Sequence, residues 1–199
     1  MSISAKDVKS LRDRTGAGMM DCKKALIETK GNLEDAIDLM RASGATKAAK
    51  RAGKVASEGT IGTYLHFDNR VASMVELNCE TDFVANTDDF KALARDIALH
   101  IASQAPAGVS DADIAPEVVD RERKIYEEQI REQGKPEHIA EKIVQGKLRK
   151  YFEDNTLMAQ PFVKNPDQTI GELVTEVSAR TGEKIEIARF VRMKVGETG

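Results

Sequence analysis

The chain has 199 residues, of which 41% are hydrophobic and 32% are charged, and its formal net charge is −3. This length accommodates one core domain with a small additional module, and the composition is typical of an ordered protein. The slightly acidic balance argues against nucleic acid as the main partner, because phosphate recognition usually requires a basic excess. A protein partner fits this balance better.

Residues 1–42 are expected to form a module of three short helices. Ser4 and Asp7 have the spacing of a capping box for the first helix. Asp21 is expected to cap the second helix, and Asn32 the third. Helices this short are unstable alone in water, so they should pack against one another. Their expected core consists of Leu11, Leu26, Ile37 and Met40.

Residues 43–57 are rich in Ala, Gly, Lys and Arg and are predicted to be a basic linker that is helical in part. A basic stripe runs along it: Lys47, Lys50, Arg51 and Lys54. Such a stripe can contact RNA or phosphate, but no aromatic residues are interleaved with it. A solvent-exposed spacer face is therefore the interpretation we favour.

Residues 58–199 are predicted to form an α+β core around a three-stranded antiparallel sheet. Period-two alternation indicates strands over 61–67 and 71–79, which form a hairpin. Thr87 marks the start of a helix whose apolar face should cover this sheet. The final strand is expected over 184–195.

A helical hairpin is predicted over residues 117–152, within the core. The run Gly134-Lys135-Pro136 separates its two arms, because Gly is favoured past a helix end and Pro at a helix start. Thr169 and Glu172 form a second capping box, which begins the last helix.

The sequence contains no motif of an enzyme active site. Cys22 and Cys79 are far apart and lack metal-ligand spacing, so neither a zinc site nor a disulfide is indicated. The three histidines, His66, His100 and His138, have no partner at ligand or nucleophile spacing, which favours surface or hydrogen-bonded histidines. We therefore predict no catalytic residue, no metal site and no cofactor.

The N-terminal residues lead directly into a charged amphipathic pattern without an apolar signal region. No apolar run of about 18 residues occurs in the chain. The sequence thus predicts a cytoplasmic protein without membrane association.

The segment Thr81-Asp82-Phe83-Val84-Ala85-Asn86 places a bulky aromatic residue beside a carboxylate on a strand-to-helix connection. The residues alone leave two interpretations open. Phe83 either projects outward, or it folds back as a hydrophobic staple over the helix that begins near Thr87. Composition alone favours the staple.

Two runs resemble the elongation factor Ts family. They are Arg14-Thr15-Gly16-Ala17-Gly18-Met19-Met20-Asp21-Cys22-Lys23-Lys24-Ala25-Leu26 and Asn78-Cys79-Glu80-Thr81-Asp82-Phe83-Val84-Ala85-Asn86. A weaker similarity lies in Leu157-Met158-Ala159-Gln160-Pro161-Phe162-Val163-Lys164, so the resemblance touches all parts of the chain.

This resemblance implies a guanine-nucleotide exchange factor that binds the GDP form of the GTPase elongation factor Tu. In that family, the segment matched by Thr81, Asp82, Phe83 and Val84 enters the partner's nucleotide-binding domain and disturbs its Mg²⁺ site. The family's N-terminal contact surface corresponds to Lys9, Met19, Met20 and Lys23. GDP release then allows GTP to bind.

Two further expectations follow from the same comparison of patterns. Longer members of the family carry two related core subdomains and this chain shows one, which suggests a symmetric homodimer that restores the doubled core. The three-helix module with a Gly-containing first loop also resembles ubiquitin-associated domains. A peptide-binding adapter is therefore the alternative function.

Overall fold

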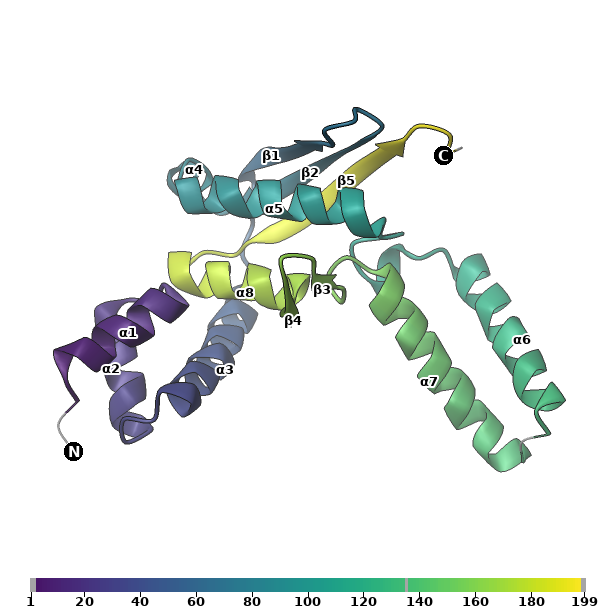
Figure 1. The fold of residues 1–199 in the computed structure, drawn as a ribbon, viewed down its shortest axis with the longest axis horizontal. Helices are drawn as coiled ribbons and strands as arrows, with labels where there is room; N and C mark the ends of the chain where they lie inside the picture. Colours follow the sequence, from purple (N-terminus) through teal and green to yellow (C-terminus); the bar gives the residue numbers. More distant parts are fainter. Residues whose placement is uncertain (1–2, 135, 198–199) are drawn as a thin grey trace. The chain divides into compact units, whose positions relative to one another are not determined.

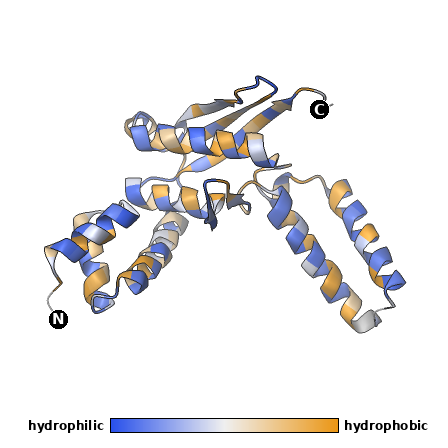
Figure 2. Ribbon diagram, in the orientation of Figure 1, coloured by the Kyte–Doolittle hydropathy of each residue, from blue (hydrophilic) through white to orange (hydrophobic). Residues whose placement is uncertain are grey.

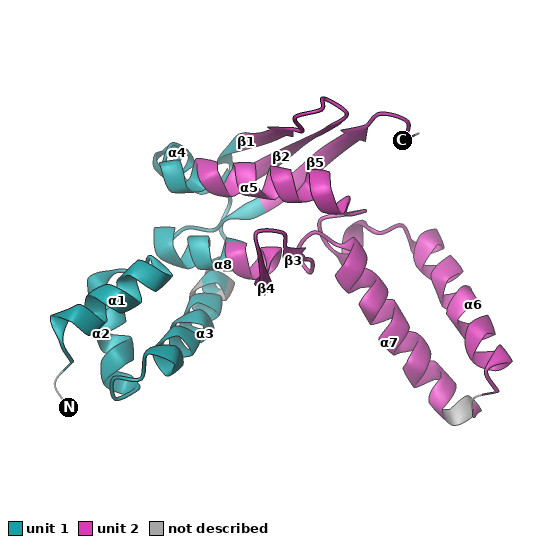
Figure 3. Ribbon diagram, in the orientation of Figure 1, with its two compact units in different colours: residues 1–60, 78–90, 174–186 teal, residues 61–77, 91–173, 187–199 magenta. Residues whose placement is uncertain are grey.

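A computed structural model describes residues 3–134 and 136–197; the side chains of Lys47, Ala49, Glu137 and His138 lie outside the description. The described residues form eight α-helices, a three-stranded sheet of order β1-β2-β5 and a two-stranded sheet β3-β4 (Figure 1). This confirms the predicted α+β class. The chain divides into a first unit of residues 1–60, 78–90 and 174–186 and a second unit of residues 61–77, 91–173 and 187–199 (Figure 3).

The elements follow in the order α1 (Ala5–Thr15), α2 (Met19–Glu28), α3 (Leu33–Arg51), β1 (Glu58–Leu65), β2 (Val71–Cys79), α4 (Asp82–Ala85), α5 (Asp88–Gln104), a 3-10 turn (Asp111–Asp113), α6 (Pro116–Glu132), α7 (Glu137–Asn155), β3 (Pro161–Phe162), β4 (Asn165–Thr169), α8 (Ile170–Thr181) and β5 (Glu186–Lys194).

Local capping chemistry begins the N-terminal helices, largely as predicted. The Ser4 hydroxyl accepts the Asp7 N–H at 3.1 Å, and the Asp7 carboxylate accepts the Ser4 N–H at 3.1 Å. The Asn32 side chain accepts the Glu34 N–H at 3.1 Å. The expected cap at Asp21 is wrong, because α2 begins two residues earlier and Asp21 lies in its first turn. A carboxylate there still interacts favourably with the helix dipole.

The three N-terminal helices share one apolar core. Its fully or nearly fully buried members are Val8, Leu11, Cys22, Ala25, Leu26 and Ala36, with Ile37 and Met40 partly buried against them. The predicted core residues are therefore all present, and this shared burial stabilises helices that are too short to persist alone.

Helix α3 is longer than the sequence pattern suggested, because it continues to Arg51 through the first part of the expected basic linker. The Ala-rich composition of this stretch has high helix propensity. Gly44 is buried where α3 meets α8, and a Cβ atom added there would lie 3.2 Å from the Ala179 Cβ. Glycine thus permits a close crossing of these two helices.

One face of the β1-β2-β5 sheet packs on α5, as predicted. A Cβ atom at Gly62 of β1 would lie 2.3 Å from the Ala94 carbonyl oxygen, so only glycine fits this close approach. The Ser73 hydroxyl donates to the Ala98 carbonyl at 2.5 Å. The helix itself begins with the predicted cap, since the Phe90 N–H donates to the Thr87 hydroxyl at 3.3 Å.

The opposite face of the sheet carries exposed apolar side chains. We call them the exposed sheet face: Ile61, Leu65, Met74, Val191 and Met193, which are between 49% and 71% exposed. The ion pair between Arg189 and Glu76, at 2.7 Å, lies on this same face by the alternation of the strands. Ile61 and Leu65 of β1 therefore point away from α5, whereas Gly62 points toward it.

Helices α6 and α7 form the predicted helical hairpin. Ile130, Val144 and Leu148 are buried between the arms, and apolar and polar residues alternate along both helices (Figure 2). Lys135, in the expected joint, lies outside the described residues. The last helix, α8, begins with the predicted capping box, in which the Thr169 hydroxyl accepts the Glu172 N–H at 3.1 Å.

His100 is a fully buried, hydrogen-bonded histidine of α5, as the sequence favoured. Its Nδ1 accepts the Val163 N–H at 3.2 Å, so Nε2 carries the hydrogen and donates to the Gln160 Oε1 at 3.0 Å. Burial lowers the pKa of this imidazole. His66 forms a hydrogen bond of 2.9 Å with the Tyr64 hydroxyl, and the His138 side chain lies outside the description.

The stability of the chain should fall as the pH drops below about 6.5, the ordinary histidine pKa, because the unfolded chain protonates His100 and the folded chain resists it. A group with a lowered pKa in the folded state contributes stability above its unfolded pKa, and that contribution is lost on acidification. Urea unfolding at several pH values would measure this. His100→Gln should flatten the profile in this range, and parallel profiles for the two proteins would contradict the assignment.

Candidate functional site

The segment from Asp82 to Ala85 forms α4, a single helical turn between β2 and α5. The Thr81 hydroxyl accepts the Val84 N–H at 3.4 Å, and the Ala85 N–H donates to the Thr81 carbonyl at 3.2 Å. Thr81 is thus the N-cap of the turn. The sequence indicated a connection here, and one turn is too short to produce a periodic pattern.

Phe83 projects from α4 into solvent, with 83% of its surface exposed. The staple interpretation is therefore wrong: the apolar residues buried around this connection are Ala85 and Phe90. Asp82 is exposed beside Phe83, and Val84 is half-buried. A large exposed ring next to a carboxylate gains free energy only when another molecule covers it.

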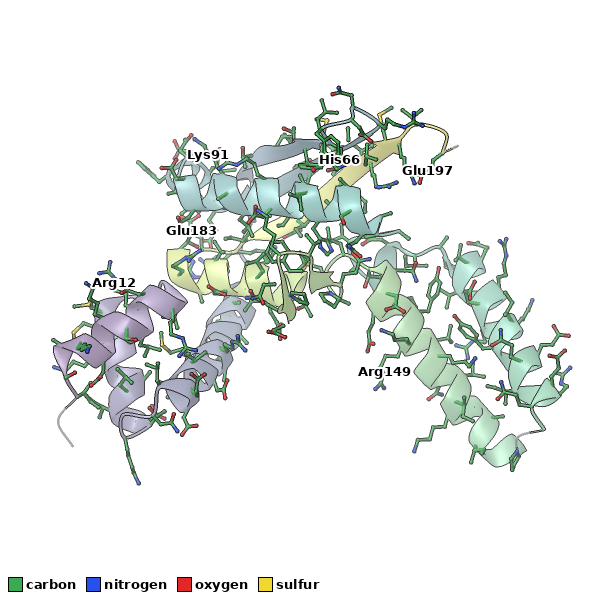
Figure 4. The ribbon with its side chains drawn as sticks, viewed as in Figure 1. Arg12, His66, Lys91, Arg149, Glu183 and Glu197 are labelled. Atoms are coloured by element: carbon green, nitrogen blue, oxygen red, sulfur yellow. The ribbon has the colours of Figure 1, made fainter. Side chains whose placement is uncertain are left out.

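The base of α4 is held by a residue that the sequence analysis missed. Glu183, which follows α8, is labelled in Figure 4. Its Oε2 accepts the backbone N–H groups of Glu80 and Thr81, each at 3.1 Å, and its Oε1 accepts the Thr81 hydroxyl at 2.6 Å. Thr81 and Glu183 are 102 residues apart in the sequence, so no local pattern could have indicated this contact.

Glu80 makes the reciprocal contacts. Its Oε1 accepts the Lys184 N–H at 2.7 Å and an Arg51 guanidinium N–H at 2.8 Å. The hydrogen bond from the Lys184 backbone and the ion pair with Arg51 lower the pKa of the Glu80 carboxyl. At least one member of the predicted basic stripe therefore has a structural partner.

Cys79 lies buried beneath the same turn. Its thiol donates to the Thr81 carbonyl at 3.1 Å, and burial, followed by the nearby Glu183 charge, raises its pKa. A thiol held in its protonated form is a weak nucleophile, so Cys79 has the environment of a structural cysteine.

The second group of predicted site residues lies on the N-terminal helices. Met19 and Met20 are 51% and 64% exposed in the first turn of α2, and Lys23 is exposed one turn later. The spacings of three and four residues put Lys23 on the same face as both methionines. Lys9 is exposed on α1, which shares a core with α2. Flexible, polarisable methionines suit an adaptable protein-binding surface.

The turn between α1 and α2 lies close to Arg180, which the sequence analysis did not connect with it. Gly16 ends α1 with a φ of 65°, and a Cβ atom there would lie 2.6 Å from the Arg180 Nη1. The left-handed conformation favours glycine at this position. Arg180 also pairs with Asp89 at 3.7 Å.

Both groups of candidate residues belong to the first compact unit, which contains residues 1–60, 78–90 and 174–186. Among the side chains that the structure describes, which leave out those of Glu137 and His138, no three from His, Cys, Asp or Glu are grouped so that they could hold a metal ion. Within residues 3–134 and 136–197, every helix is too short or too polar to cross a membrane.

Comparisons with known proteins match nearly the whole chain to one family. The model of the family described as "Elongation factor TS" matches residues 4–197. The chain is 50% identical to elongation factor Ts of Desulfosudis oleivorans over 196 residues, which are 98% of this chain and 99% of the relative. It is 49% identical to elongation factor Ts of Thermosipho melanesiensis over 195 residues, which are 98% of this chain and 100% of that relative.

Phe83 is exposed and Phe90 is fully buried, so truncation to alanine should affect the free energy of unfolding far less at Phe83 than at Phe90. Phe83→Ala should change the free energy of unfolding by less than about 0.5 kcal/mol. Phe90→Ala should lower it by about 3–5 kcal/mol, through lost burial and a residual cavity. Urea unfolding of both variants would measure this, and a large loss for Phe83→Ala would restore the staple interpretation.

Proposed function

The chain belongs to the elongation factor Ts family, and we propose that it is a guanine-nucleotide exchange factor of translation elongation. It binds elongation factor Tu in its GDP form, disturbs the partner's Mg²⁺ site and promotes GDP release so that GTP can bind. The observation that carries this proposal is Phe83, which is 83% exposed beside Asp82 on a short helix braced at its base.

The chemistry of a phosphate-bound Mg²⁺ site suits this mechanism. Mg²⁺ requires near-ideal octahedral geometry, so its ligands tolerate little displacement. The Phe83 ring, inserted beside the site, would shift the structure that supports the Mg²⁺ ligands. The Asp82 carboxylate would disturb the ligands themselves. Thr81, Asp82, Phe83 and Val84 are the residues to which we assign this role. Linkage makes the effect reciprocal, since GDP must weaken binding of the chain by the same factor.

The available free energy shows that Phe83 cannot act alone. Burying one phenylalanine contributes about 1.5–3 kcal/mol, whereas a ligand with nanomolar affinity is bound by about 12 kcal/mol. Other contacts must therefore stabilise the nucleotide-free partner. We assign this role to Lys9, Met19, Met20 and Lys23, which lie in the same compact unit as Phe83.

On this proposal the chain acts by binding and catalyses no reaction of its own, and it works in the cytoplasm with the translation machinery. The adapter alternative receives less support. A ubiquitin-associated module would account only for the first fifty residues or so, whereas the family match extends over residues 4–197.

A kinetic experiment should distinguish the role of Phe83 from that of the N-terminal residues Lys9, Met19, Met20 and Lys23. Stopped-flow release of a fluorescent GDP from elongation factor Tu, measured against chain concentration, gives a maximal rate and a half-saturating concentration. Phe83→Ala should lower the maximal rate about tenfold, while Met20→Ala should mainly raise the half-saturating concentration.

Phe67→Ala is the matched control for this experiment, because Phe67 is 88% exposed in the β1-β2 turn. It should leave both parameters unchanged. Unchanged release with Phe83→Ala would reject the wedge role, and no acceleration by the unmodified chain would reject the exchange function.

We further propose that the chain forms a symmetric homodimer through the exposed sheet face. Its five apolar residues are about half exposed or more, and they lie on one side of a sheet whose other side packs on α5. Two copies related by a two-fold axis would bury the same surface on both partners, as two sheets packed face to face.

Light scattering at micromolar concentration should give twice the 21.8 kDa mass of the chain. Met193→Glu puts a charge at a position that is 71% exposed on this face, and it should yield the monomer mass because the dimer would have to bury that charge. Val55→Glu, at a position 79% exposed outside the sheet, should leave the dimer intact. A monomer mass for the unmodified chain would contradict the proposal.

A further inference from the structure

We infer that Glu183 is a positioning residue for nucleotide exchange, because its carboxylate fixes the base of α4 and thereby the direction in which Asp82 and Phe83 project. This inference rests on the proposed exchange function. It assigns a role to a residue outside both groups of expected contact residues.

The Glu183 side chain is bound to the turn by three hydrogen bonds. One oxygen accepts the backbone N–H groups of Glu80 and Thr81, and the other accepts the Thr81 hydroxyl, at distances of 2.6–3.1 Å. Both carboxylate oxygens are therefore engaged, and each bond has a charged acceptor. Charge-assisted bonds of this kind are shorter and stronger than those between neutral groups.

The Thr81 hydroxyl transmits this constraint to α4. It donates to Glu183 and accepts the Val84 N–H, which makes Thr81 the cap of the turn. The bond to Glu183 fixes the rotamer of Thr81, since the hydroxyl must face the carboxylate. A turn of four residues has no independent helical stability, so its conformation depends on such external contacts.

Hydrogen bonds of the neighbouring backbone also hold Glu183 in place. The Ser178 hydroxyl donates to the Glu183 carbonyl at 2.6 Å, and the adjacent Lys184 N–H donates to the Glu80 carboxylate at 2.7 Å. Arg51 donates to that same Glu80 carboxylate, so a cation lies beside Glu80. Glu183 thus binds the backbone before α4, and Glu80 binds the backbone after Glu183.

The ring of Phe83 is 83% exposed, so packing does not fix its direction, and the backbone of α4 sets where its Cα–Cβ bond points. A loosened base would leave the ring present and able to touch the partner. The loosened turn would let the ring point in many directions. Because a group that acts in one geometry loses much of its effect when it is slightly misplaced, the rate of GDP release should fall strongly. Loss of the brace should therefore reduce the maximal rate of GDP release more than it reduces binding.

Glu183→Gln tests this with little change in shape. An amide has one acceptor oxygen, which cannot serve three donors on two sides, and its NH₂ group would face a donor. In stopped-flow release of a fluorescent GDP from elongation factor Tu, we expect a maximal rate about tenfold lower and a half-saturating concentration within about threefold of the unmodified chain. Glu128→Gln, at an exposed position of α6, is the control with the same charge change and should leave both parameters unchanged.

A second pair of variants keeps the test independent of the folding of Glu183→Gln. Thr81→Val removes the hydroxyl at nearly constant volume and should reproduce the slow release. Thr81→Ser keeps the hydroxyl and should release GDP faster than Thr81→Val. Hydrogen exchange of the free chain should show faster exchange of the Glu80 and Thr81 amides in Glu183→Gln than in the control.

The outcomes separate this inference from the function on which it rests. If the unmodified chain fails to accelerate GDP release, both the exchange function and the role of Glu183 in it are rejected. If the unmodified chain accelerates release and Glu183→Gln does so equally, only the role of Glu183 is rejected. Equal release by Thr81→Val and Thr81→Ser, or unchanged amide exchange in Glu183→Gln, would likewise overturn it.

Discussion

The hydrogen bonds between the Glu183 carboxylate and the Thr81 segment join two parts of the chain that are 102 residues apart. They lie where β2 leaves the sheet and where the chain enters β5, its neighbour in the strand order β1-β2-β5. The same end of the sheet gives rise to α4, and Arg51 reaches it from the end of α3. One polar brace therefore connects the sheet, the projecting turn and the last helix of the N-terminal module.

The elements that sequence reasoning predicted well are those specified by neighbouring residues. The capping boxes at Ser4 and Thr169 form as expected, because each requires two side chains only three positions apart. The hairpin and the helix after Thr87 follow from equally local signals. The length of α3 was underestimated because its Ala-rich second half lacks an apolar stripe, although it has high helix propensity and packs on α8 through Gly44.

The remaining features depend on contacts that no local pattern contains. Alternation in β1 shows that Ile61 and Leu65 share a face, but it does not tell which face α5 covers; the close approach at Gly62 decides this. The residues around Phe83 are compatible with a staple or a projecting ring, and composition alone favours the staple. The structure shows the ring exposed, on a turn whose base is bound by Glu183, and that contact spans 102 residues and could not be inferred from local sequence.

A residue that acts on a partner's site must be exposed and yet hold one direction, and these requirements conflict in a single side chain. Packing normally supplies rigidity, but packing would bury the ring. Here the two properties are divided: Phe83 remains exposed, Ala85 and Phe90 anchor the connection in the interior, and polar bonds to Glu183 orient the turn. Such an arrangement concentrates rigidity in the backbone beneath the ring. Under the proposed exchange function, less of the free energy of binding is then spent on ordering α4 when the partner binds.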